Sequence, residues 1–213
     1  MPRIGGGREF QKEVDRMHHF LRLVVLACAL VSSACQHQGF NWNQEENTFI
    51  QKEMSDKPDA SGSIEMRFVS LVNVPASDLF HAFSDVEHHA DFIEGVTESK
   101  LVSSDGKKKV VDVTNTVFGR PNRARIEWTI DAPTMTMSFR TLEAEFTNNA
   151  AEYKVEASPD GKRARITTVY HLRDTGGHPF PLYSLKQGVV DGYVTAVRSL
   201  KRQALGKSAV VGR

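Results

Sequence analysis

The chain has 213 residues, of which 40% are hydrophobic and 25% are charged, a composition typical of a globular protein with a core of its own. This length predicts one domain plus a tail or targeting segment. The formal net charge is +1 at pH 7, and the basic residues are spread out without interleaved aromatics, which argues against nucleic-acid binding. Both cysteines, Cys28 and Cys35, lie near the N-terminus, so the rest of the chain has neither a disulfide framework nor a cysteine metal site.

The N-terminal segment has the pattern of a secretory signal. Residues 21–34 (LRLVVLACALVSSA) form an apolar run that ends in small residues, and Arg16 and Arg22 flank it. The run is shorter than the roughly 18–20 residues that a membrane-spanning helix needs. We therefore predict a signal segment over residues 1–34, with Met17 as a candidate true start.

Cys35 directly follows the small residues Ser32, Ser33 and Ala34. A cysteine at this place resembles the lipidated first residue of a mature bacterial lipoprotein, although such signals prefer an aliphatic residue where Ser32 stands. We expect a lipidated Cys35 to anchor the exported chain to a membrane, and plain export to the periplasm with cleavage after Ala34 is the alternative. The several acyl chains of a lipoprotein cysteine would hold the protein firmly in a membrane, whereas a single acyl chain binds membranes only marginally.

A polar stretch separates this signal from the first segment with strand composition. Residues 35–62 carry scattered aromatics among polar residues, and Pro58, Ser61 and Gly62 end the stretch. We predict a tether over residues 35–62.

The pattern of a folded domain begins at residue 63. Residues 63–73 have strand composition, and Pro75 breaks the strand before two short helical segments at 76–85 and 86–95. Six segments of period-two alternation follow, separated by turn signals such as Asp160-Gly161. Each has a single apolar face, and they span residues 97–103, 108–117, 123–130, 134–143, 150–157 and 163–173.

A long helix is predicted over about residues 181–205, followed by a disordered tail over 206–213. One apolar stripe runs along the helix, and Gly188 and Gly192 interrupt it. Each glycine costs roughly 1 kcal/mol of helix stability relative to Ala. It is therefore either tolerated, or it allows a close approach of the helix to the sheet or to a ligand. Since no other element is long enough to cover the apolar face of the strands, we predict an α+β domain over 63–205 with an antiparallel sheet curved around this helix.

The opening of this domain resembles that of the START-like (SRPBCC) superfamily, which includes polyketide cyclases/dehydrases and lipid-transport proteins and has the helix-grip fold. The resemblance rests on residues 74–80 (VPASDLF), 83–87 (FSDVE), 88–93 (HHADFI) and 96–101, and it extends over about residues 64–203. The pattern is similar to the coenzyme Q-binding branch. That branch usually has Tyr-Pro where His88-His89-Ala90 stands here, so we assign the superfamily and not ubiquinone as ligand.

A sheet that grips one helix can enclose an apolar cavity with a few polar groups that orient a ligand. Trp and Tyr suit such a site because they combine a large apolar face with a hydrogen-bonding tip. The predicted partner is a hydrophobic small molecule or lipid, with no cofactor, and the alternative for each lining residue is a place in an ordinary core. The predicted ligand-binding residues are Trp128, Met137, Phe139, Tyr153, Tyr170, Val189 and Tyr193.

Catalytic and metal-binding motifs do not appear in the predicted domain. It has no GxSxG or HExxH motif, and the adjacent His88 and His89 would point apart on a solvated helix surface. Strand alternation places Asp112 and Glu127 outward. We therefore assign no catalytic residue and no metal ligand, and expect a ligand-binding or lipid-handling domain. A cyclase, dehydratase or hydrolase that uses the same cavity, and an envelope scaffold with a filled core, are the two alternatives.

Overall fold

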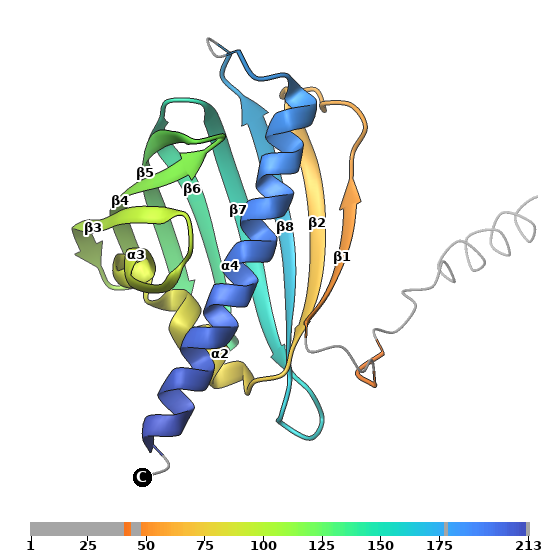
Figure 1. Ribbon diagram of the computed structural model, residues 1–213, viewed down its shortest axis with the longest axis vertical. Coiled ribbons are helices and arrows are strands. Elements are labelled where there is room, and N and C mark those ends of the chain that lie inside the picture. The colour runs from red at the N-terminus through yellow and green to blue at the C-terminus, as the bar shows by residue number, and fades with distance from the viewer. Residues whose placement is uncertain (1–40, 44–47, 177–178, 212–213) are drawn as a thin grey trace, which may run out of the picture. The chain divides into compact units, whose positions relative to one another are not determined.

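The computed structural model describes residues 41–43, 48–176 and 179–211 (Figure 1). The chain divides into two units, residues 1–43 and 44–213, and the second holds all the elements described below. The predicted signal segment and Cys35 lie outside the described residues. Within the described ranges, no helix is both long enough and apolar enough to span a membrane.

The described part of the second unit forms one antiparallel sheet of eight strands, in the order β1-β2-β8-β7-β6-β5-β4-β3. The strands are β1 (Thr48–Met54), β2 (Ser63–Val72), β3 (Val96–Asp105), β4 (Lys108–Val117), β5 (Arg120–Asp131), β6 (Thr136–Ala144), β7 (Thr147–Ala157) and β8 (Ala164–Asp174). The helical elements are α2 (Ala76–Ser84), η1 (Val86–His88), α3 (His89–Phe92), η2 (Ala132–Thr134) and α4 (Leu182–Val211).

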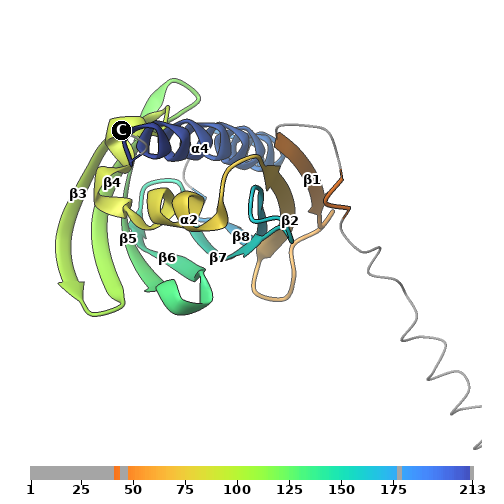
Figure 2. The same ribbon diagram turned by 90° about the horizontal axis from the view of Figure 1, so that it is seen from below.

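The architecture confirms the predicted helix-grip fold. The sheet curves around the long helix α4, and α2 lies across one end of the curve, between α4 and the sheet (Figure 2). The seven predicted strands correspond to β2–β8, and the two short helical segments lie between β2 and β3 as expected. The short connections of the meander from β3 to β8 explain why neighbours in sequence are neighbours in the sheet.

Two segments differ from the sequence-based expectation. Residues 48–54, inside the predicted tether, form β1 and pair with β2 from Met54↔Met66 to Thr48↔Val72. This pairing satisfies the backbone hydrogen-bonding groups along the edge of β2, which would otherwise be unpaired. The predicted tail is helical as far as Val211, because one glycine at Gly206 does not end a helix whose preceding turn is anchored by the fully buried Ala204.

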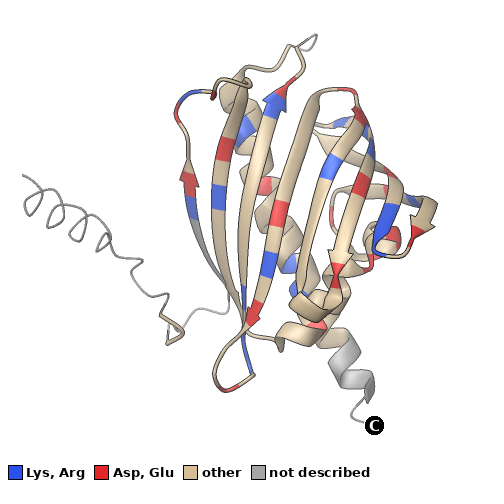
Figure 3. Cartoon of the chain, turned by 180° about the vertical axis from the view of Figure 1, so that it is seen from behind, with Lys and Arg blue, Asp and Glu red and all other residues tan. Residues whose placement is uncertain are grey.

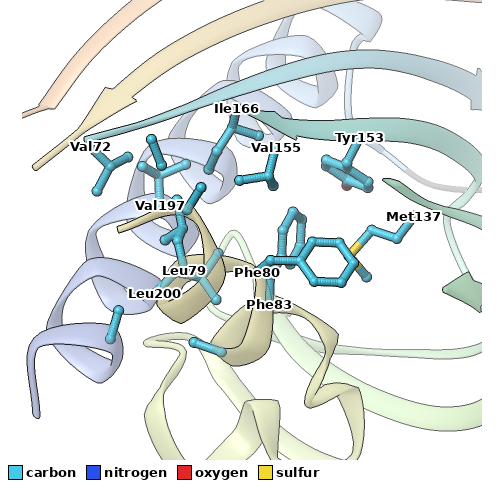
Figure 4. Close-up of a cluster of buried hydrophobic side chains, with 14 of the residues drawn as sticks. Val72, Leu79, Phe80, Phe83, Met137, Tyr153, Val155, Ile166, Val197 and Leu200 are labelled. Atoms are coloured by element: carbon cyan, nitrogen blue, oxygen red, sulfur yellow. The ribbon is translucent and has the colours of Figure 1, made fainter. Parts of the chain in front are cut away.

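The larger core cluster joins α2, the sheet and the second half of α4 (Figure 4). Leu79 of α2 and Leu200 of α4 are almost fully buried there, against sheet residues such as Ile166. Because α2 is amphipathic, its buried side fills the space between helix and sheet at this end. This end of the fold is therefore closed by packed side chains.

A second core cluster holds the first half of α4. Leu185 and Val190 pack there against Phe68 of β2 and Leu172 of β8. The beginning of α4 is therefore seated over β2 and β8, at one side of the sheet. Tyr170 and Tyr193 pack against both clusters and lie at their junction.

The two glycines of α4 have different surroundings. An added Cβ at Gly192 would meet nothing within 4 Å, whereas one at Gly188 would lie 3.4 Å from Cζ of Phe118. Since Gly192 is exposed and helical, Gly192→Ala is expected to raise the free energy of unfolding by about 0.5–1 kcal/mol in urea titrations. Gly188→Ala should gain about the same or slightly less, because its Cβ would stand at the lower limit of van der Waals contact with Phe118. A loss of stability in Gly192→Ala would contradict the exposed placement.

Candidate ligand site on the inner face of the sheet

Strand alternation gives the sheet an inner face toward α4 and an outer face toward solvent. Five of the predicted ligand residues lie on the inner face, and Val189 and Tyr193 lie on α4. Trp128, Met137 and Tyr153 are 7%, 3% and 9% exposed, within the larger core cluster. The other four, Phe139, Tyr170, Val189 and Tyr193, are half-buried. Phe139 packs against the larger cluster and Val189 against the second one, whereas Tyr170 and Tyr193 pack against both. The structure thus brings these residues to one layer between sheet and helix.

Aromatic rings form a connected group across four strands of this layer. The ring centroids of Trp128 and Phe139 are 5.0 Å apart, and those of Phe139 and Tyr170 are 5.9 Å apart. Tyr153 meets Phe83 of α2 edge to face at 4.7 Å. Such offset and edge contacts are the favourable arrangements of aromatic pairs. The group presents flat apolar surfaces that could accept a ring or chain.

On the inner face of β4–β6, burial is greatest at Val111, Trp128 and Met137. It is lower toward the end opposite α2, and Ile130 on the α2 side is also half-buried. Along β5, Trp128 is buried, whereas the inward-facing Ile126, Ala124 and Asn122 are half-buried. Along β6, Met137 is buried and Phe139 and Thr141 are half-buried, and β4 follows the same trend beyond Val111. Because α4 begins over β2 and β8, it leaves the inner face of β4–β6 partly accessible. We call this half-buried region of β4–β6 the inner opening.

Three phenylalanines from three connections meet beside the inner opening. Phe118, at the β4–β5 turn, packs on Phe180 before α4 with centroids 4.7 Å apart. Phe146, at the β6–β7 turn, meets Phe180 at 5.8 Å. Phe118 is 48% exposed and has a left-handed φ of 50°, which is unusual for a bulky residue. These rings give the rim of the opening an apolar character.

Three hydroxyl groups meet inside the site. The Tyr193 hydroxyl shares a hydrogen bond of 3.0 Å with Ser70 Oγ, and Thr168 Oγ1 donates to it at 3.3 Å. The Tyr193 ring stacks on Phe68 at 4.3 Å. Burial raises the pKa of Tyr193, and the bonds to Ser70 and Thr168 oppose the rise. Burial likewise raises the pKa of Tyr153 and of Tyr170, so all three tyrosines are neutral hydrogen-bonding groups at physiological pH.

His89 corrects one sequence-based expectation. It was expected on a solvated helix surface, but it is 8% exposed and packs edge-on against Trp128, with ring centroids 6.0 Å apart. Its Nε2 lies 3.0 Å from the Phe83 carbonyl oxygen, which accepts the ring proton. Burial lowers the pKa of His89 to about 4, so the ring is neutral at physiological pH. His88, by contrast, is exposed and pairs with Asp85 at 2.6 Å.

Polar groups without protein partners occur on the inner face, and sequence reasoning missed two of them. Trp128 Nε1, Asn122 Oδ1 and Asn149 Oδ1 are buried atoms with no hydrogen-bond partner among the described residues. The amide nitrogens of the asparagines are used, since Asn122 donates to Asn115 and Asn149 donates to Thr147. A polar residue at an inward position of an alternating strand is the signal that would have found them.

The outer face carries charge instead (Figure 3). Arg125 binds Asp112 through two bonds of 2.7 and 2.9 Å, and Arg140 donates to Glu127 at 2.8 Å. The Arg125 guanidinium lowers the pKa of Asp112, and Arg140 does the same for Glu127. Both acids thus point outward as expected and are ionised partners of arginines. A depression of about 190 Å³ on this face lies over β5–β8 and includes His171.

Asp85, Glu87 and His88 lie close enough for one ion, with a possible ligand atom of each within 4.8 Å of the others. These groups already have partners, because His88 bonds Asp85 and Lys109 Nζ lies 2.5 Å from Glu87 Oε2. The pairings neutralise the acids, so the trio gives no reason to assign a metal site.

Comparisons with known proteins agree with this fold. A family model described as polyketide cyclase / dehydrase and lipid transport matches residues 63–204. The Zhui aromatase/cyclase from Streptomyces sp. R1128 is similar in structure, with a TM-score of 0.62 and 17% identity over 67% of this chain and 93% of its own. A START superfamily protein from Mycobacterium smegmatis has a TM-score of 0.58 and 9% identity over 67% and 97%. Ara h 8.0201 has a TM-score of 0.52 and 18% identity over 75% and 97%. The comparison with curated proteins gives no match.

Proposed function

Because the chain belongs to the polyketide cyclase/dehydrase and lipid transport family, we propose that it binds a hydrophobic small molecule or lipid on the inner face of its sheet. The observation that carries this proposal is the inner opening. Apolar and aromatic side chains on the inner face, among them Ile126 and Phe139, are only half-buried because α4 is seated over β2 and β8. A partly accessible apolar surface inside a fold is the kind of place where apolar ligands bind.

Binding would be a partition from water into the layer between sheet and helix. Burial of apolar ligand surface contributes about 25 cal/mol per Å², so about 200 Å² would contribute about 5 kcal/mol. The rim residues Phe118 and Phe180 offer a first apolar contact on the way in. Trp128, Tyr153 and Tyr170 supply the deeper surface, and Tyr193 supplies a hydroxyl that is already held in place.

Native and denaturing mass spectra of the gently purified protein test the proposal. A stoichiometric apolar compound that is present in the native spectrum and lost on denaturation would support it and give the class of ligand. An empty protein that also fails to take up Nile red, a neutral dye that fluoresces in apolar surroundings, would contradict it. That outcome would favour a scaffold that acts through its surface.

A second candidate is an enzyme of the cyclase type, and the buried neutral His89 is the observation that favours it. The ring lies beside Trp128, and Nδ1 is the unprotonated nitrogen because Nε2 donates to Phe83. If this candidate is correct, the compound found by mass spectrometry changes mass on incubation with the wild type and not with His89→Gln. Recovery of the compound unchanged from both proteins would exclude it as the substrate.

Export and lipid anchoring through Cys35 are also proposals, supported by the apolar run at 21–34 and the small residues before the cysteine. We expect Cys35→Ser to move most of the protein from the membrane fraction to the soluble envelope fraction and to abolish labelling by radioactive palmitate. Cys28→Ser is the matched control and should leave both unchanged. Unaltered membrane association of Cys35→Ser would contradict anchoring at this residue.

A further inference from the structure

The inner face of the sheet is almost without charge. Among its described inward-facing residues that are buried or half-buried, Lys109 carries the only charge, and it is already bound to Glu87. Burial of an ionised ligand group costs several kcal/mol unless a counter-charge meets it. A carboxylate or phosphate would therefore have to break the Lys109–Glu87 pair or remain outside. The site favours a neutral ligand.

The same face has a hydrogen-bond donor that the protein leaves unused. Trp128 is 93% buried, and its Nε1–H has no acceptor among the described residues. Its neighbours are the rings of His89, Phe139 and Tyr153, none of which accepts its proton. A buried donor without a partner costs about 1–3 kcal/mol, so a ligand oxygen that meets it gains affinity beyond its apolar contacts.

Unused acceptors lie nearer to the inner opening. Asn122 Oδ1 and Asn149 Oδ1 are both buried and unpaired, and their amide nitrogens are engaged elsewhere. Asn122 precedes Trp128 by six residues on β5, which is about 20 Å along a strand. The face therefore offers a donor at its deep end and acceptors near its opening. This suits a ligand whose carbonyl or ether oxygen reaches Trp128 and whose hydroxyl group meets an asparagine nearer to the opening.

From this arrangement we infer that the ligand is a neutral oxygenated compound, a ketone, quinone, ether or hydroxylated ring or chain, whose acceptor oxygen binds Trp128 Nε1–H. This inference rests on the proposed function. It adds the chemical class of the ligand and the residue that recognises the ligand oxygen. Trp128 would select oxygenated ligands over hydrocarbons of the same shape. The lack of an unpaired cation among the described inward-facing residues that are buried or half-buried would exclude acids.

Three probes of similar shape separate the effect of the hydrogen bond from the effect of charge. They are fluorene, its neutral ketone 9-fluorenone, and the anion 9-fluorenecarboxylate. Displacement of Nile red from the purified protein gives their affinities. We expect wild type to bind fluorenone about 5–10-fold more tightly than fluorene, the effect of one neutral hydrogen bond, and the anion at least 10-fold more weakly than fluorenone. Trp128→Phe keeps a ring but lacks the N–H, so its fluorenone-to-fluorene ratio should fall to about one.

The ratio is taken within each protein, so a change of cavity volume in Trp128→Phe affects both probes alike. Equal affinities of wild type for fluorene and fluorenone would overturn the inference while leaving the proposed function intact, and so would a ratio that survives in Trp128→Phe. Binding of the anion as tight as that of the ketone would overturn the neutral class. If neither Nile red nor any of the three compounds binds wild type, the proposed function fails, and the inference fails with it.

Discussion

Lowering the pH from 7 to 4 is expected to remove about 3 kcal/mol of folding free energy through His89 alone. Burial holds the pKa of His89 at about 4 in the folded protein, below the ordinary value of 6.5. The unfolded chain therefore takes up a proton between pH 6.5 and pH 4 that the folded chain does not. Stability from this group is fully present above pH 6.5 and is lost as the pH falls toward 4, by about 1.4 kcal/mol for each pH unit.

Urea unfolding at pH 7 and pH 4.5 measures this loss. Acidic residues with lowered pKa values also destabilise the protein in acid, so wild type must be compared with a variant that differs only here. His89→Gln keeps an N–H that can donate to the Phe83 carbonyl but does not titrate, and it should lose markedly less stability than wild type. His81→Gln, at an exposed position of α2, should behave as wild type. An equal loss in wild type and His89→Gln would contradict the buried placement of His89.

Filling the inner opening with one large side chain is expected to reduce ligand affinity by more than tenfold. Ala124 faces inward on β5, between Val113 of β4 and Ala144 of β6, and is half-buried. An indole at this position would occupy the space over Ile126 and Asn122 that the ligand needs. The protein should still fold, because the site is not packed on all sides and overpacking costs typically about 1–3 kcal/mol even in a full core.

The matched control is the neighbouring residue on the same strand. Arg123 is exposed and faces outward, so Arg123→Trp adds an equal side chain to the opposite face. Nile red titration should give wild-type affinity for Arg123→Trp and a loss of more than tenfold for Ala124→Trp, with both variants folded by circular dichroism. Wild-type affinity of Ala124→Trp would place the ligand elsewhere.

The β-meander and the terminal helix were predictable because their patterns are local. In β5, Trp128, Ile126 and Ala124 alternate with charged residues. This alternation alone is enough to assign the apolar face of the strand to the side that packs against α4. β1 was not predictable in this way. Its sequence TFIQKEM is partly polar, and it becomes a strand by pairing with β2, which is a tertiary contact.

The polar groups of the candidate site were harder to foresee than its aromatic residues. Asn122 and Asn149 lie one residue before the predicted strands 123–130 and 150–157, but the structure places them inside β5 and β7. His89 belongs to α3, a helix of four residues, and so short an element has no periodicity that shows which side is buried. The aromatic lining followed from alternation, whereas the groups that would give specificity depend on where strands begin and how a single helical turn is seated.

Photolabelling with a neutral apolar diazirine, followed by peptide mass spectrometry, tests most directly whether ligands bind the inner face. Inner and outer residues alternate along each strand, so adjacent positions report opposite faces. We predict light-dependent labels on Tyr170, Ile126 and Val189 that an excess of Nile red prevents. Labels confined to outward residues around the shallow outer depression, such as His171 and Glu152, would contradict the account and move the binding surface to the other side of the sheet.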